Sequence, residues 1–321
     1  VGANYWLGNR LVGNADSSRW LAVGLAFNLC LLGYYKYFGF LVMDVFGLQL
    51  AQDSLPHLPL GISFFTFQSI SYLVDVHRGQ AQKARSFSDL ALYICMFPQL
   101  IAGPIVRYNT VSSAIISRQI SSTDVYQGIG LFLSGLAYKV LLANNVAPLA
   151  DQAFAAGTPL SQADAWLGAL AYTLQIYFDF AGYSLMAIGI GRVLGFHFPQ
   201  NFNYPYISQS ITEFWRRWHM SLSSWFRDYL YIPLGGNRLG AARTYLNLGL
   251  VFLLCGLWHG AAWTFLTWGI YHGLLLVVER AGFADLLKRM PAVLRLGYPL
   301  LMVIIGWVIF RADTLPLALA Y

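Results

Sequence analysis

The stretch CGLWHGAAWTF, Cys255 to Phe265, places a histidine within an almost unbroken run of apolar and small residues. A second histidine, His219, directly follows Trp218 in another aromatic-rich stretch and falls on its apolar side. A partly buried imidazole stays neutral and can accept a proton near physiological pH. His259 and His219 therefore mark a candidate site, because an imidazole among apolar residues needs a reason to be there.

Cys255 lies four residues before His259, the helical spacing that would put a thiol beside its base. A covalent acyl-enzyme is one interpretation, and a cysteine that only packs in an apolar helix is the other. The three cysteines have no paired spacing, and His219, His259 and His272 lack the HExxH spacing of a zinc site. The sequence predicts neither a disulfide framework nor a metal.

The composition indicates a membrane protein. Hydrophobic residues make up 57% of the 321 residues and charged residues 11%, against about 25% charged in soluble domains. A water-soluble globule could not cover that much apolar surface, so we predict an all-α polytopic membrane protein. The net charge of +6 is explained by loops at the membrane surface and requires no nucleic acid partner.

Polar residues inside apolar stretches are costly in a membrane and mark candidate sites. Gln175 and Asp179 are four residues apart and share a helix face, which we expect to look into the protein and contact substrate. The alternative is an aspartate that pairs with a neighbouring helix to hold packing. His272 precedes Glu279 by seven residues and is expected to be a hydrogen-bonded packing histidine.

We expect roughly seven to nine membrane segments. The apolar stretches that suggest them are Trp20 to Met43, Leu58 to Val76, Val125 to Leu149, Ala165 to Val193, Tyr245 to Trp258, Ala261 to Val278 and Pro299 to Phe310. Several are shorter than the roughly 20 residues that cross a bilayer, so tilt and partial entry are expected.

Lysines and arginines gather at 78–85, 216–243 and 280–295, and the positive-inside rule predicts that all three loops are cytoplasmic. Three full crossings between the first two loops would contradict this. The segment Ser88 to Ile105, whose FPQLIAGP core holds two prolines and a glycine, is therefore predicted to be re-entrant.

Ser210 followed by Glu213 is a capping box and predicts the start of an amphipathic helix. Glu213 and Arg217 are four residues apart and can form an ion pair. An aromatic stripe that includes Trp215 repeats at spacings of three and four, with Arg216 and Arg227 on another face. We expect this helix to lie in the membrane interface.

Five stretches together resemble the membrane-bound O-acyltransferase (MBOAT) family, and in particular its bacterial alginate O-acetyltransferase branch. They are PLGISFFTFQSISYLVDVHRG (59–79), FPQLIAGPIVRY (97–108), QIYFDFAGYSLMAIGIGRVLGF (175–196), NFNYPYISQSITEFWRRWHMSLSSWFRDYLYIPLGGNR (201–238) and GLWHGAAWTFLTWGIYHG (256–273). The resemblance covers nearly the whole sequence. It implies an MBOAT-like bundle in a single membrane-embedded domain over residues 1–321, as a piece of a longer chain in the bacterial inner membrane.

The resemblance also implies a reaction. His259 matches the essential histidine of the family and His219 a second polar position, while Trp215 and Trp258 join Gln175 and Asp179 as expected substrate contacts. An acetyl group would pass from a cytoplasmic thioester, acetyl-CoA or an acyl carrier, to hydroxyls of an exopolysaccharide such as alginate. Periplasmic acetyltransferase proteins are the expected partners, with membrane lipid around the chain and no bound cofactor.

Some alternatives stay open at this point. A polysaccharide or lipid transporter would also use intramembrane aspartate, glutamine and histidine, although transporters usually show internal repeats with matched broken helices. The role of His219 also stays open, since it could bind, orient or polarise the acyl carbonyl. The acceptor polymer, the acyl donor and the oligomeric state have no signature in the sequence.

Overall fold

The computed structural model describes residues 1–51, 53, 55–100, 102–155 and 160–321, and every regular element in these ranges is a helix. The residues form two compact units, Val1–Leu133 with Ser184–Pro199, and Ser134–Tyr183 with Gln200–Tyr321. The prediction of an all-α protein is confirmed for the described residues. That of one membrane-embedded domain over residues 1–321 stays a prediction.

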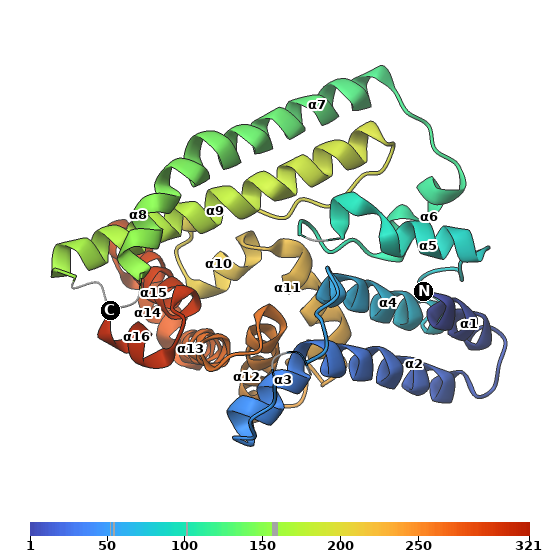
Figure 1. Ribbon diagram of the computed structural model, residues 1–321, viewed down its shortest axis with the longest axis horizontal. Coiled ribbons are helices and arrows are strands. Elements are labelled where there is room, and N and C mark those ends of the chain that lie inside the picture. The colour runs from blue at the N-terminus through green and yellow to red at the C-terminus, as the bar shows by residue number, and fades with distance from the viewer. Residues whose placement is uncertain (52, 54, 101, 156–159) are drawn as a thin grey trace. The chain divides into compact units, whose positions relative to one another are not determined.

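Unit 1 holds the helices of the N-terminal part of the chain (Figure 1). They are α1 (Gly2–Leu11), α2 (Ser17–Leu32), α3 (Phe38–Phe40), α4 (Ile62–His77), α5 (Phe87–Cys95), α6 (Tyr108–Ile116), most of α7 (Ser122–Ala137) and the last turns of α9 (Gln162–Val193). Its core gathers apolar side chains of α1, α4, α5 and α6 around Tyr72 and Tyr93, which are completely buried.

Unit 2 holds the remaining helices and both candidate histidines. Its helices are α8 (Asn144–Phe154), most of α9, α10 (Ile211–Arg217), α11 (Met220–Phe226), α12 (Ala241–His259), α13 (Trp263–Val278), α14 (Ala284–Arg289), α15 (Ala292–Arg311) and α16 (Leu315–Ala320). Short π-helical segments extend α7 over Tyr138–Ala143, α11 over Arg227–Tyr231 and α13 over Glu279–Phe283.

Four helical stretches in the described residues are long and apolar enough to cross a membrane. They are Ser17–Val45, Ser122–Phe154, Ala241–His259 and Ala292–Arg311, and each contains one of the apolar stretches picked out from the sequence. The total of seven to nine segments stays a prediction.

The segment expected to be re-entrant has a broken backbone. Helix α5 ends at Cys95, a 3-10 turn follows over Phe97–Gln99, and no further helix begins before Tyr108; Ile101 lies outside the described residues. Tyr93 donates a hydrogen bond from its hydroxyl to the carbonyl of Val106 at 2.8 Å, and most of the described residues of the break are buried, although Phe97 is exposed. This burial is what broken backbone at membrane depth requires, while re-entry itself stays a prediction.

Glycines allow α7 and α9 to run side by side (Figure 1). In unit 1, a Cβ on Gly189 would lie 2.5 Å from the carbonyl oxygen of Gly128. In unit 2, a Cβ on Gly182 would lie 2.7 Å from that of Gly135. Small residues at such crossings let membrane helices pack backbone to backbone.

Candidate functional site

His219 occupies a break between α10 and α11. The sequence predicted one continuous helix from Ser210, and its start is confirmed, since the Ser210 hydroxyl accepts a hydrogen bond from the Glu213 amide at 3.0 Å. The continuation is wrong: α10 ends at Arg217, and His219 has left-handed backbone angles of φ 43° and ψ 54°. A non-glycine residue pays roughly 1–2 kcal/mol for that conformation, so the surrounding contacts must hold it.

The segment that begins at Asn201 supplies those contacts. The Met220 amide donates to the Asn201 carbonyl, and the Asn203 amide donates to the Arg217 carbonyl, both at 2.9 Å. The side-chain oxygen of Asn201 lies 3.0 Å from Nδ1 of His219 and accepts hydrogen bonds from the Ser221 hydroxyl at 2.8 Å and the Ser221 amide at 3.3 Å. Backbone groups that a continuous helix would have paired internally are paired with this segment instead.

The aromatic stripe of α10 and α11 is buried rather than displayed at a surface. Trp215, Trp218 and Trp225 are each less than a tenth exposed. On the opposite side of the stripe, Glu213 and Arg217 form the predicted ion pair at 2.8 Å, while Arg216 and other basic side chains are exposed. This part of the chain is therefore embedded in unit 2, and its place in the membrane interface stays a prediction.

Aromatic rings surround the His219 imidazole, which is 1% exposed. Phe180 meets it edge to face with ring centres 4.8 Å apart, and Trp258 lies 5.9 Å away. His219 lies outside the four candidate spans. Burial lowers the pKa of His219 well below its usual range, and the nearby His259 adds to the shift. The imidazole is therefore neutral at physiological pH.

His259 is the last residue of α12 and is partly exposed. The rings of Trp258, Trp268 and Phe310 lie 5.0 to 5.1 Å from its own, each close to perpendicular. The helix stops there because Gly260 is extended, and a Cβ on Gly260 would collide with the ring of Phe265 at 2.1 Å. The glycine after the histidine thus lets α13 fold back directly beside the imidazole.

The two candidate histidines are brought together through Trp258, whose indole lies 5.0 Å from the His259 ring and 5.9 Å from the His219 ring. The sequence separates them by 40 residues, and only the return of α12 past the α10–α11 break unites them. We call this site the histidine pair. It consists of His219, His259 and Trp258, whose ring contacts both imidazoles.

Trp215 belongs to a neighbouring part of the same aromatic cluster. Its ring contacts Trp268 at 5.5 Å, Phe252 at 5.1 Å and His272 at 5.1 Å. It therefore supports Trp268, which in turn contacts His259. A direct contact of Trp215 with substrate stays a prediction.

The two polar residues of α9 have different surroundings. Asp179 forms an ion pair with Lys139 of the neighbouring helix, both about half exposed, which is the packing arrangement considered as the alternative above. The side-chain oxygen of Gln175 is buried and has no hydrogen-bond partner among the described residues. Of the two, Gln175 keeps a polar group that a substrate could satisfy.

The prediction that His272 is hydrogen-bonded is wrong for the described residues, and Glu279 is not its partner. Neither ring nitrogen of His272 has a hydrogen-bond partner among the described residues, and its imidazole is completely enclosed. Glu279 instead turns to the first turn of α10, where it accepts hydrogen bonds from the Ile211 amide and from the amide and hydroxyl of Thr212 at 2.6 to 2.9 Å. Sequence reasoning missed this role because no local pattern links Glu279 to residues 68 positions earlier.

Asn201 was also missed as a functional residue. Its only signal in the sequence was its place at the head of the NFNYP stretch.

Within the part of the chain that the structure describes, no group of three histidine, cysteine, aspartate or glutamate side chains could hold a metal ion.

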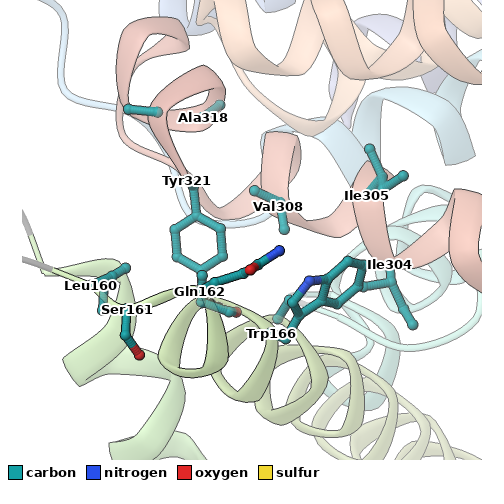
Figure 2. Close-up of a pocket in the computed structure, with 12 residues that line it drawn as sticks. Leu160, Ser161, Gln162, Trp166, Ile304, Ile305, Val308, Ala318 and Tyr321 are labelled. Atoms are coloured by element: carbon teal, nitrogen blue, oxygen red, sulfur yellow. Dashed lines mark hydrogen bonds between the residues drawn. The ribbon is translucent and has the colours of Figure 1, made fainter.

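A cavity of about 460 Å³ lies elsewhere in unit 2, against the first turns of α9. Figure 2 shows Gln162 and Trp166 of α9 facing Ile304 and Val308 of α15, with Tyr321 closing one side. None of the predicted site residues lines it, so the cavity and the histidine pair are separate features.

Comparisons with known proteins find a matching family model and several similar proteins. The model of the membrane-bound O-acyltransferase family matches residues 56–292, which include both histidines. A probable alginate O-acetylase of Azotobacter vinelandii is 48% identical over 98% of this chain and 65% of its own length. A peptidoglycan O-acetyltransferase of Helicobacter pylori is 40% identical, over 95% of this chain and 64% of its own length.

A more distant relative is a teichoic acid D-alanyltransferase of Bacillus subtilis, 32% identical over 69% of this chain and 60% of its own length. The chain thus spans a little less than two thirds of each of these three proteins.

Proposed function

Because the chain belongs to the membrane-bound O-acyltransferase family, we propose that it forms the membrane part of an O-acyltransferase that acetylates an extracytoplasmic polysaccharide. The names of the alginate and peptidoglycan relatives support acetyl as the transferred group and a cell-surface polysaccharide as the acceptor. The single observation that carries the proposal is the histidine pair, two imidazoles joined through Trp258 inside an aromatic enclosure.

In the proposed reaction His259 is the general base. The acceptor hydroxyl, on the sugar itself or on a periplasmic partner protein that passes the acetyl group to the sugar, is a poor nucleophile. A neutral imidazole that accepts its proton during attack contributes roughly 100-fold to 10,000-fold. The hydroxyl oxygen bonds to the carbonyl carbon of the thioester, the carbon–sulfur bond breaks, and the leaving thiolate takes the proton from the imidazolium. His259 lies at a helix end and is partly exposed, so a substrate can approach it.

The aromatic enclosure serves the same reaction. Trp258, Trp268 and Phe310 surround His259 and would limit the access of water, which otherwise hydrolyses the thioester. Two of the proposed substrate contacts have the most direct structural support. Trp258 touches both histidines, and the side-chain oxygen of Gln175 is buried with no partner among the described residues. Cys255 is buried one helical turn before His259, and the proposal assigns it only a packing role.

The donor is proposed to be a thioester, acetyl-CoA or an acyl carrier, on the cytoplasmic side of the bacterial inner membrane, with no resident cofactor. Four apolar helices support a multi-pass location. Periplasmic acetyltransferase proteins are proposed to complete delivery to the polymer. Purified full-length protein that acetylates polymer at full rate alone would contradict this need for a companion.

The decisive experiment is mass spectrometry of cell-surface polymers from wild-type and deletion strains. Loss of one O-acetyl modification in the deletion strain, restored by the wild-type gene, is the expected result, and it identifies the acceptor and the acyl group together. Polymers with identical acylation in both strains would contradict the proposal.

A further inference from the structure

The hydrogen bonds around Asn201 define which atom of its side chain faces His219. The Ser221 backbone N–H can only donate a hydrogen bond, and it points at the Asn201 side-chain atom that also lies 3.0 Å from His219 Nδ1. That atom must therefore be the oxygen Oδ1, because an amide NH₂ there would set two donors against each other. The Ser221 hydroxyl, 2.8 Å from the same atom, donates to it as well.

An oxygen facing Nδ1 in turn determines the position of the imidazole proton. Amide oxygens accept hydrogen bonds and do not donate them, so the contact at 3.0 Å is made only if Nδ1 carries the proton. A neutral imidazole has one N–H, and the other nitrogen then presents a lone pair. For His219 this other nitrogen is Nε2, which is buried and has no hydrogen-bond partner among the described residues.

We propose that Asn201 is a positioning residue that holds His219 as the Nδ1–H tautomer, so that Nε2 accepts a hydrogen bond from an O–H or N–H group of the substrate. The inference rests on the proposed function for the existence of that substrate, and it deepens it by restricting the role of His219. A nitrogen that presents a lone pair cannot polarise an acyl carbonyl, which needs a donor. His219 therefore binds and orients a hydrogen-bond donor of the substrate.

The break between α10 and α11 also depends on Asn201 and helps to place the imidazole of His219. His219 reaches Asn201 because its backbone is left-handed, and the Met220 amide is paired with the Asn201 carbonyl rather than within a helix. One asparagine thus uses its backbone carbonyl to hold the start of α11 and its side chain to hold the imidazole. A hydrogen bond made by one ring nitrogen of a histidine determines whether the other nitrogen carries the proton.

Nitrogen-15 NMR of histidine-labelled full-length protein in lipid nanodiscs tests the tautomer directly, with His219→Gln identifying the resonances. The expected spectrum has a protonated Nδ1 and an unprotonated Nε2 for His219. Asn201→Asp keeps an oxygen toward Nδ1 and should retain this pattern, whereas Asn201→Leu should lose it. Ser221→Ala is the matched control and should retain the pattern, because it removes one donor to Asn201 and the longer contact of 3.5 Å between the Ser221 hydroxyl and His219 Nδ1, but leaves the Asn201 oxygen in place.

A protonated Nε2 in the wild-type protein would overturn the inference, and so would an unchanged spectrum in folded Asn201→Leu. These readings need no substrate and no activity. If the deletion strain keeps all its acylation while the tautomer is as expected, the proposed function fails and the substrate contact of Nε2 fails with it, but the assignment of the tautomer to Asn201 stands. If acylation depends on the chain but Nε2 carries the proton, only the inference about Asn201 fails.

The polymer assay adds the functional consequence. Asn201→Leu in a complemented deletion strain should lower the O-acetyl content of the polymer at least tenfold at equal protein level, and Asn201→Asp should restore part of it. Full acetylation with Asn201→Leu would contradict the positioning role, because an equally folded protein would then work with the tautomer unconstrained.

Discussion

Glu279 closes onto the first turn of α10 by accepting the amide hydrogen of Ile211 at 2.6 Å, although 68 residues separate the two. The carboxylate is 2% exposed and also receives the amide and hydroxyl of Thr212. It therefore connects the end of α13 to the helix that leads into His219. This connection fixes α10, and with it the position of His219, relative to the end of α13.

The first prediction concerns the stability of a variant that lacks the Glu279 carboxylate. Glu279→Ala leaves buried donors of α10 unpaired, which costs roughly 1–3 kcal/mol for each unsatisfied group, so a clear fall in the midpoint of thermal unfolding in detergent is expected. Asp285→Asn is the control, since Asp285 pairs with Lys288 on an exposed surface. Equal unfolding midpoints for the two variants would show that the hydrogen bonds of Glu279 to α10 do not stabilise the protein.

His259→Ala should remove essentially all acetyl transfer while the protein stays folded. Loss of a general base raises the barrier by about 3 to 5 kcal/mol. Polymer O-acetyl content in the complemented deletion strain, normalised to protein level, is the measurement. Cys255→Ala should change it little. Equal damage from both substitutions, with labelled acyl group trapped on the wild-type chain, would favour the covalent interpretation instead.

Two glycines of α12 should respond in opposite ways to alanine. A Cβ on Gly256 would lie 2.2 Å from the Phe265 carbonyl oxygen, so Gly256→Ala should force α12 and α13 apart and lower thermal stability. A Cβ on Gly249 meets nothing within 4 Å, and Gly249→Ala should stabilise the helix by up to about 1 kcal/mol. Melting curves of the two variants decide the matter, and a stable Gly256→Ala protein would refute the close packing.

The pH dependence of stability follows from His219. Its folded-state pKa is lowered by burial, while the unfolded chain protonates near about 6.5. The unfolded state therefore binds more protons below that pH, and stability should fall as the pH drops through this range. His219→Gln should weaken the dependence of the unfolding midpoint between about pH 7 and 5. A decline unaltered by His219→Gln would exclude His219 as its source.

The basic loops 78–85, 216–243 and 280–295 should share the cytoplasmic side. Arg78, Arg238 and Arg280 are exposed positions within them, so single cysteines placed there should resist an impermeant thiol reagent in whole cells and react after lysis. Labelling of one loop in intact cells, but not of the others, would contradict the predicted re-entrant segment from Ser88 to Ile105.

Local patterns in the sequence determined the class of this protein, its longest apolar helices and some of its short-range contacts. The apolar composition gave the class, and the stretches that became the four candidate spans were visible as runs. The cap at Ser210 and the pair of Glu213 with Arg217 also formed as predicted, because their partners lie three and four residues apart. His259 stood out because an imidazole is costly in an apolar run.

Only the tertiary structure decided how His219 is used. Periodicity continued through Trp218 and His219, yet the helix breaks there, because Asn201, 18 residues earlier, pairs with the backbone and the imidazole. The pairing of Asp179 with Lys139 and the turn of Glu279 toward α10 likewise depend on helices that meet only after folding. A helical pattern records which faces are apolar; hydrogen bonds between distant segments then choose where the helix stops and which histidine nitrogen keeps its proton.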